Sequence, residues 1–122
     1  VLLLLPRLRK CMMFFVYFHI EVEDCLYEEL ESPPAETTLE NQAIANIAQI
    51  FDAPVERCGR RRTDGALVCS FKTASLTEAR KTIYTHGIAE GNDQIACGTD
   101  YVIVRDFEDE SGNLIWKQAT GA

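Results

Sequence analysis

The sequence predicts an α+β fold in which an antiparallel sheet carries two helices on one of its faces. Three observations lead to this prediction. Several segments alternate apolar and polar residues, as half-buried strands do. Two other segments repeat apolar residues at spacings of three and four, and each begins with a helix-capping signature. These elements follow one another in the order strand, helix, strand, strand, helix, strand.

The first predicted strand covers residues 13–22 and has two unlike faces. Apolar side chains occupy one face, which is therefore expected in the core. These side chains are Phe14, Val16, Phe18, Ile20 and Val22. The other face carries Phe15, Tyr17, His19 and Glu21. Because this second face mixes aromatic and polar groups, it predicts a surface that is half covered or used for binding.

Two segments predict helices, and both begin with Ser or Thr followed three residues later by Glu. These capping boxes are Thr37 with Glu40 and Ser75 with Glu78. The acidic segment 23–34 before the first helix predicts a loop with one short turn. Pro54 is expected to stop the first helix, and Gly87 or Gly91 the second. The predicted buried stripes are Leu39, Ala43, Ile44, Ile47, Ile50 and Phe51 in the first helix and Leu76, Ala79 and Ile83 in the second.

The remaining segments predict strands. Residues 55–62 and 66–73 flank Asp64-Gly65, a dipeptide that favours a tight turn, so they predict a hairpin. Residues 100–107 and 113–117 predict two further strands joined by a turn. The full order is that of the ferredoxin-like (βαββαβ) fold with an added C-terminal strand.

Composition and charge exclude several classes of protein. The 122 residues are 47% hydrophobic and 25% charged, which is typical of one globular domain. A net charge of −7, from 12 Lys plus Arg and 19 Asp plus Glu, argues against nucleic acid as a partner. Five cysteines without any CxxC pair, and only two histidines, favour neither a metal site nor a disulfide framework. We therefore expect no cofactor, no metal and a reducing, cytoplasmic setting.

The first eleven residues differ from the rest of the chain. The apolar run Val1–Leu5 precedes its basic residues, which is the reverse of a signal peptide, and a membrane span needs about 20 apolar residues. We expect residues 1–11 to be a leader that is appended or encoded upstream, and residues 12–122 to be a single α+β domain with no membrane partner. In the alternative interpretation, Leu2–Leu5 forms an extra edge strand or a partner-binding arm.

If both helices cover one face of the sheet, the opposite face gathers the remaining strand side chains. The residues expected there are Phe15, Tyr17, His19, Tyr101, Ile103, Arg105 and Phe107. Exposed apolar patches of this kind mark contacts with partners or ligands. The sequence therefore favours a homodimeric binding module that packs two such faces together. The alternatives are a protein partner, a cleft for an apolar small molecule, or a final strand that folds over the face with Leu114 and Trp116.

Catalysis is the alternative function, and the sequence does not favour it. None of the standard catalytic or phosphate-binding motifs occurs. Glu21 lies two residues from His19 on one strand face, so it is expected to orient the imidazole as a general base while Arg105 stabilises an anion. The same three residues make an ordinary surface ion network equally well. The basic stretch from Arg57 to Lys81 is expected to pair with the acidic loop.

Overall fold

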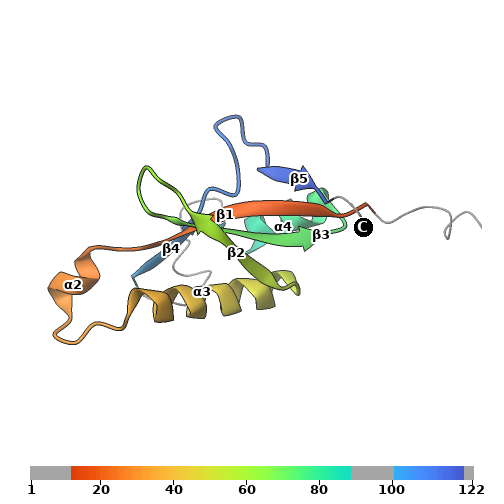
Figure 1. Ribbon diagram of the computed structural model, residues 1–122. Helices are drawn as coiled ribbons and strands as arrows, with labels where there is room; N and C mark the ends of the chain where they lie inside the picture. The colour runs from red at the N-terminus through yellow and green to blue at the C-terminus, as the bar shows by residue number, and fades with distance from the viewer. Residues whose placement is uncertain (1–11, 89–100, 120–122) are drawn as a thin grey trace, which may run out of the picture.

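The computed structural model describes residues 12–88 and 101–119, so the predictions for residues 1–11 lie outside the described part of the chain. The elements are β1 (Phe14–Val22), α2 (Cys25–Glu29), α3 (Glu36–Phe51), β2 (Val55–Arg60), β3 (Leu67–Thr73), α4 (Leu76–Thr85), β4 (Val102–Arg105) and β5 (Trp116–Gln118). Figure 1 shows α3 running along one side of the sheet and α2 beyond the end of β1. The fold is therefore α+β, as predicted.

The five strands form one antiparallel sheet in the order β2-β3-β1-β4, with β5 also on β1. One edge of β1 pairs with β3 along Phe14–Ile20. The other edge is shared, because β5 pairs with Phe14–Val16 and β4 with His19–Val22. The final strand therefore lengthens the sheet at the edge of β1, and the interpretation in which it folds over the sheet is wrong.

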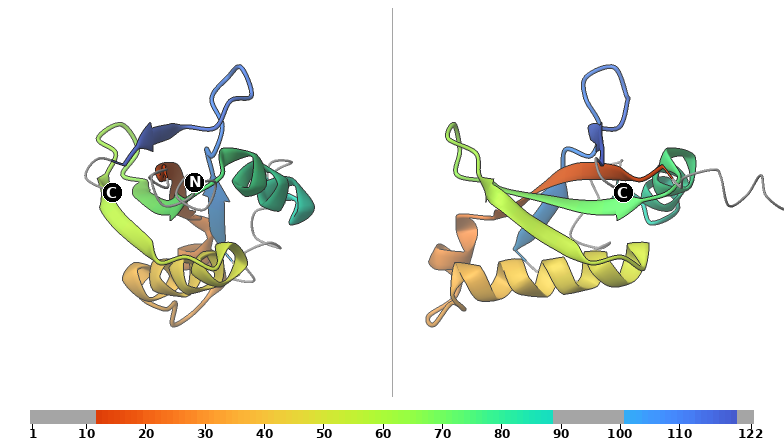
Figure 2. Two further views of the ribbon diagram at one scale, coloured as in Figure 1. Left: turned by 90° about the vertical axis from the view of Figure 1, so that its right-hand side faces the viewer. Right: turned by 45° about the vertical axis from the view of Figure 1, so that its right-hand side comes forward.

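The core lies between the sheet and the helices. Val16, Phe18 and Ile20 of β1 are fully buried and belong to one apolar cluster. The helices add Leu26, Leu39, Ala43, Ile47, Ala79 and Ile83 to the same cluster. In the left view of Figure 2, α3 runs below the sheet and α4 lies to its right. Because the helices bury their apolar residues with this face of β1, the opposite face carries no helix of the described chain.

The N-cap half of the second capping box is confirmed, whereas the backbone N–H of Ser75 donates to Thr73 Oγ1 and not to the Glu78 side chain. Ser75 precedes α4, and its Oγ accepts a hydrogen bond from the backbone N–H of Glu78 at 3.1 Å. Ala79 and Ile83 are buried, as expected of the inner face of this helix. Gly87 follows the helix with a φ of 71°, a left-handed conformation that glycine adopts without strain. The alternative stop at Gly91 lies outside the described residues.

The first capping box is wrong, although its helix is confirmed. α3 begins at Glu36, after Ala35, and no side chain caps it. Thr37 therefore lies inside the first turn. Glu40 is 1% exposed and accepts hydrogen bonds from arginines of β2, so a contact with a distant strand has displaced the local cap.

The hairpin around Gly65 is confirmed, but the strand predicted over residues 100–107 is shorter. β4 is bounded by Tyr101 and Asp106, whose φ angles of 67° and 64° are left-handed. A left-handed residue breaks the alternation of side chains along a strand. Phe107 consequently points into the core and is only 3% exposed, so its predicted place on the open face is wrong.

The acidic segment contains one short helix, α2, rather than only a turn. Leu26 anchors this helix, because its side chain is fully buried in the core cluster.

Among the described residues, no helix has the length and apolar character needed to cross a membrane.

Candidate functional site

The candidate site is the face of the sheet opposite the helices, called the open face from here on. The strand register places on it Phe15, Tyr17, His19, Glu21, Glu56, Val68, Ser70, Lys72, Ile103, Arg105 and Lys117. Ile115 joins them, because its carbonyl accepts a hydrogen bond from the Tyr17 N–H at 2.9 Å, which continues the pairing of β1 with β5. The Ile115 side chain is 38% exposed, while Phe15, Tyr17 and Ile103 are half-buried. The open face thus carries partly exposed apolar side chains among polar and charged ones.

Five of the residues predicted from the sequence come together on the open face, and two do not. Phe15, Tyr17, His19, Ile103 and Arg105 share it. Phe107 stacks on Phe18 in the core, with ring centroids 4.8 Å apart. Tyr101 precedes β4, packs against the core cluster, and donates a hydrogen bond from its hydroxyl to Glu29 at 2.8 Å. Both exceptions follow from the left-handed residues that bound β4.

Several open-face residues were missed, although the sequence holds a signal for some of them. The alternation in β3 separates Val68, Ser70 and Lys72 from the buried side chains of the same strand. A systematic alignment of strand alternations would have found these three residues. Ile115 and Lys117 carry no such local signal, because their position depends on β5 pairing with β1.

The end of the open face nearest the start of β1 is basic. Phe15 lies directly between Lys72 of β3 and Lys117 of β5 in the strand register. The ammonium nitrogen of Lys72 lies 5.4 Å from the centre of the Phe15 ring, within range of a cation–π contact. This row of the sheet therefore combines one aromatic ring with two positive charges.

The opposite end of the open face holds an ionic cluster formed by His19, Glu21, Arg61, Asp64, Arg105 and Asp106. The Nδ1 atom of His19 lies 2.7 Å from Oδ2 of Asp106. Glu21 instead pairs with Arg105, with Nη2 and Oε2 2.9 Å apart. The prediction that Glu21 orients the imidazole is therefore wrong, because Asp106, brought in by its left-handed backbone, occupies that position.

Arg61 and Asp64 attach the β2–β3 loop to this cluster. Two nitrogen atoms of the Arg61 guanidinium group, Nε and Nη2, donate to the Asp64 carboxylate at 3.0 and 2.5 Å. These bonds, together with the backbone N–H of Ala66, hold the pKa of Asp64 well below its usual value. The same contact raises the pKa of Arg61. Asp64 also lies 3.4 Å from Nη2 of Arg105, so the loop contacts β4.

The arginines of β2 do not pair with the acidic loop, contrary to the prediction. Arg60 makes two hydrogen bonds of 2.9 Å to the carboxylate of Glu40 on α3, and Arg57 approaches the same carboxylate at 3.3 Å. The bond to Glu40 raises the pKa of Arg60. These side chains lie on the helix side of the sheet, because Arg57 and Arg60 oppose the buried Cys69 and Leu67. They therefore fasten β2 to α3 and do not belong to the open face.

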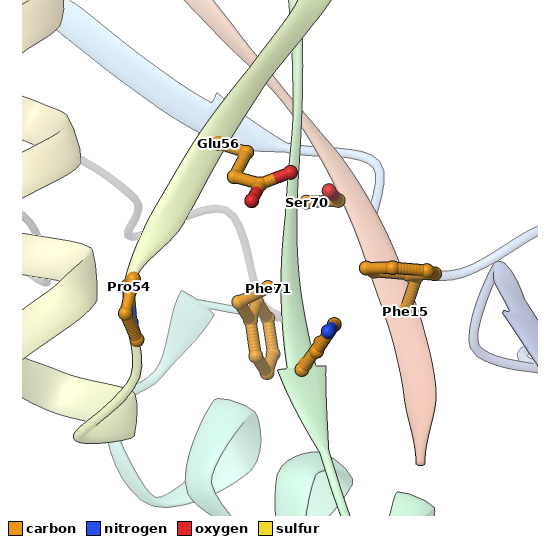
Figure 3. Close-up of a pocket in the computed structure, with 6 residues that line it drawn as sticks. Phe15, Pro54, Glu56, Ser70 and Phe71 are labelled. Atoms are coloured by element: carbon orange, nitrogen blue, oxygen red, sulfur yellow. The ribbon is translucent and has the colours of Figure 1, made fainter. Parts of the chain in front are cut away.

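A hollow of about 170 Å³ interrupts the open face between β2 and β1. It is lined by Phe15, Pro54, Glu56, Ser70, Phe71 and Lys72. Figure 3 shows the Glu56 carboxylate on β2 and the Phe15 ring on β1, with β3 between them. The hollow thus has apolar and charged walls, whereas the ionic cluster lies at the other end of the face.

The cysteines and other metal-ligating residue types of the described chain are scattered. Within residues 12–88 and 101–119, no three His, Cys, Asp or Glu side chains group closely enough to hold a metal ion. Cys25, Cys58 and Cys69 are unpaired. Burial raises the pKa of the Cys69 thiol to about 12, so it stays protonated and unreactive. Cys58 is exposed.

Comparison of the chain with known protein families, with curated proteins and with solved structures finds no match.

Proposed function

We propose that the protein is a self-associating binding module in which two copies pack open face against open face. The observation that carries the proposal is the set of partly exposed apolar side chains on a face without helices. Phe15, Tyr17, Ile103 and Ile115 contribute this surface. Burying apolar area of this kind drives association, and aromatic residues are enriched at the centres of such interfaces.

The charges at the two ends of the open face favour a second copy of the chain as the partner. One end carries Lys72 and Lys117 on either side of Phe15. The other end, the ionic cluster, holds three carboxylates and two guanidinium groups beside His19. In a two-fold dimer with antiparallel faces, the basic end of each copy lies on the carboxylate-rich end of the other. Such a surface is complementary to itself.

The same proposal includes the ferredoxin-like arrangement and a reducing compartment. The strand order β2-β3-β1-β4, with α3 between β1 and β2 and α4 between β3 and β4, supports two interlocked strand–helix–strand units. β5 is then an addition at the edge of β1.

The exposed, unpaired Cys58 supports a cytoplasmic setting, where thiols stay reduced.

Charge reversal tests the antiparallel geometry. The double variant Lys72→Glu/Lys117→Glu makes both ends of the face acidic, and Glu21→Lys makes both ends basic. We expect each chain alone to associate about 10-fold more weakly than the parent, because like charges face each other. An equimolar mixture of the two is expected to recover association as a mixed dimer. Lys81→Glu, an exposed position on α4, is the matched control and leaves association unchanged. A mixture that associates no better than its components contradicts the geometry.

A second candidate function rests on the contact between His19 and Asp106. A carboxylate 2.7 Å from Nδ1 fixes the tautomer that leaves Nε2 as a base, which is the arrangement found in general-base catalysis. Arg105, opposite His19 in the register, supplies a positive charge for an anion. In this function, His19→Ala abolishes turnover while the oligomeric state stays unchanged. If His19→Ala weakens association instead, the histidine serves the interface.

A further inference from the structure

We propose that the hollow over Ser70 binds a small zwitterion with an apolar body, the class to which aliphatic α-amino acids belong. One chain contributes every lining residue, so this inference does not rest on the proposed dimer. The hollow is distinct from the ionic cluster and from the His19 site. Its volume of about 170 Å³ suits a small metabolite and not a peptide segment.

The hollow exists because a small residue lies between larger ones. Ser70 faces Tyr17 on one side and Glu56 on the other in the register, and its side chain is smaller than either of these neighbours. Ser70 is 3% exposed, and the Cys58 thiol lies 3.3 Å from its hydroxyl. The floor is therefore fixed and polar. The Phe15 ring and Pro54 supply apolar walls on opposite sides of β3 (Figure 3).

The charged groups at the hollow have opposite signs and lie on different sides. Glu56 projects from β2 (Figure 3). The Lys72 ammonium nitrogen lies 5.4 Å from the centre of the Phe15 ring on β1. Among the residues that the structure describes, neither group takes part in an ion pair. A zwitterion placed over Ser70 would direct its ammonium group to Glu56 and its carboxylate to Lys72, with its apolar side chain against Phe15 and Pro54.

The test is a titration followed by two-dimensional amide NMR, with L-leucine and two analogues as probes. Isocaproate lacks the ammonium group of leucine, and isoamylamine lacks its carboxylate. We expect leucine to cause saturable shifts at Phe15, Ser70 and Lys72. Each analogue is expected to bind about 5-fold more weakly, because each loses one partly exposed charge contact.

Two variants of charged residues that line the hollow test which charged group of the ligand each residue contacts. Glu56→Gln is expected to abolish the preference for leucine over isocaproate while keeping the preference over isoamylamine. Lys72→Gln is expected to do the reverse. Glu110→Gln and Lys81→Gln, which are exposed positions outside the hollow, serve as matched controls and keep both preferences. Ser70→Leu fills the hollow and removes the shifts. If Ser70→Leu does not fold, the ligand preferences of Glu56→Gln and Lys72→Gln still test the proposal.

A second copy on the open face competes with the ligand for Phe15, so the titration is repeated on Ile103→Glu, which disfavours association. Ile103 lies on β4 and does not line the hollow. Leucine binding to this variant, even where the parent fails to bind, supports the site. Absence of saturable shifts in both proteins, or equal binding of leucine and its two analogues, overturns the proposal.

Discussion

The imidazole of His19 on β1 lies against the carboxylate of Asp106, the residue that follows β4, with Nδ1 and Oδ2 2.7 Å apart. Asp106 has a φ of 64°, so the chain changes direction there and the next side chain, Phe107, turns from the open face into the core. The two residues are 87 positions apart in the sequence. Their contact marks the boundary between the open face and the buried side of the sheet.

The position of Phe107 leads to the first prediction. Phe107→Ala is expected to lower the free energy of unfolding by about 3–5 kcal/mol, because it leaves a cavity beside Phe18. Phe15→Ala, on the half-buried open face, is the matched control and is expected to cost less. Urea denaturation of both variants measures the difference. Equal losses would contradict the assignment of Phe107 to the core.

The backbone of Asp106 leads to the second prediction. Asp106→Gly keeps the left-handed conformation but loses the contact with His19, whereas Asp106→Ala loses the contact and strains the backbone. Asp106→Ala is therefore expected to be less stable than Asp106→Gly by about 1 kcal/mol. Thermal or urea denaturation compares the two. If the alanine variant is as stable as the glycine variant, the left-handed turn is not required.

The buried carboxylate of Glu40 leads to the third prediction. Arg57→Met/Arg60→Met leaves this carboxylate without its charged partners and is expected to cost about 3–5 kcal/mol. Adding Glu40→Leu is expected to recover most of that loss, because the buried charge is removed as well. Arg62→Met, at an exposed position of the same hairpin, is the control. If the triple variant is no more stable than the double variant, the loss has another cause.

The lowered pKa of Asp64 leads to a prediction about acid stability. The carboxyl group of Asp64 has a lower pKa in the folded protein than in the unfolded chain, where it is about 4. Its contribution to stability is therefore complete above about pH 4 and is lost as the pH falls toward the folded value. Asp64→Asn is expected to be less stable than the parent at neutral pH and to lose less stability on acidification.

Urea denaturation across this pH range tests the prediction. Arg61→Gln removes the first cause of the lowered pKa and is expected to show the same shallow pH dependence as Asp64→Asn. Parallel stability curves for the parent and both variants would show that this pair does not contribute to acid sensitivity.

Local patterns in the sequence were sufficient for much of the fold. The alternation in β1, the cap at Ser75 and the turn at Gly65 each depend on neighbouring residues, and each was predicted. The predicted cap at Thr37 is wrong because the Glu40 carboxylate accepts a hydrogen bond from Arg60, twenty positions further along the chain. No local sequence pattern predicts a contact between residues so far apart in the chain.

The candidate site was predicted in part for the same reason. Alternation placed Phe15, Tyr17 and His19 on one face of β1. It also implied that Phe107 continues the face, since nothing in the local sequence signals the left-handed Asp106. The sequence predicts that Glu21, the neighbour of His19 on the strand, supplies the carboxylate beside it, whereas the structure places Asp106 there from beyond β4. Closeness in the sequence does not reliably predict which acidic side chain contacts a histidine.

Association of two copies through the open face changes the mass in solution, so measuring that mass tests the proposed dimer. Light scattering over a series of concentrations is measured for the parent and for Tyr17→Glu, which places a charge at the centre of the face. We expect the parent to approach twice the mass of one chain and Tyr17→Glu to remain at the mass of one chain with unchanged circular dichroism. Tyr27→Glu, at an exposed position on α2, is expected to behave as the parent. A parent that stays monomeric at every concentration, or a Tyr17→Glu variant that still forms the dimer, would contradict association through the open face.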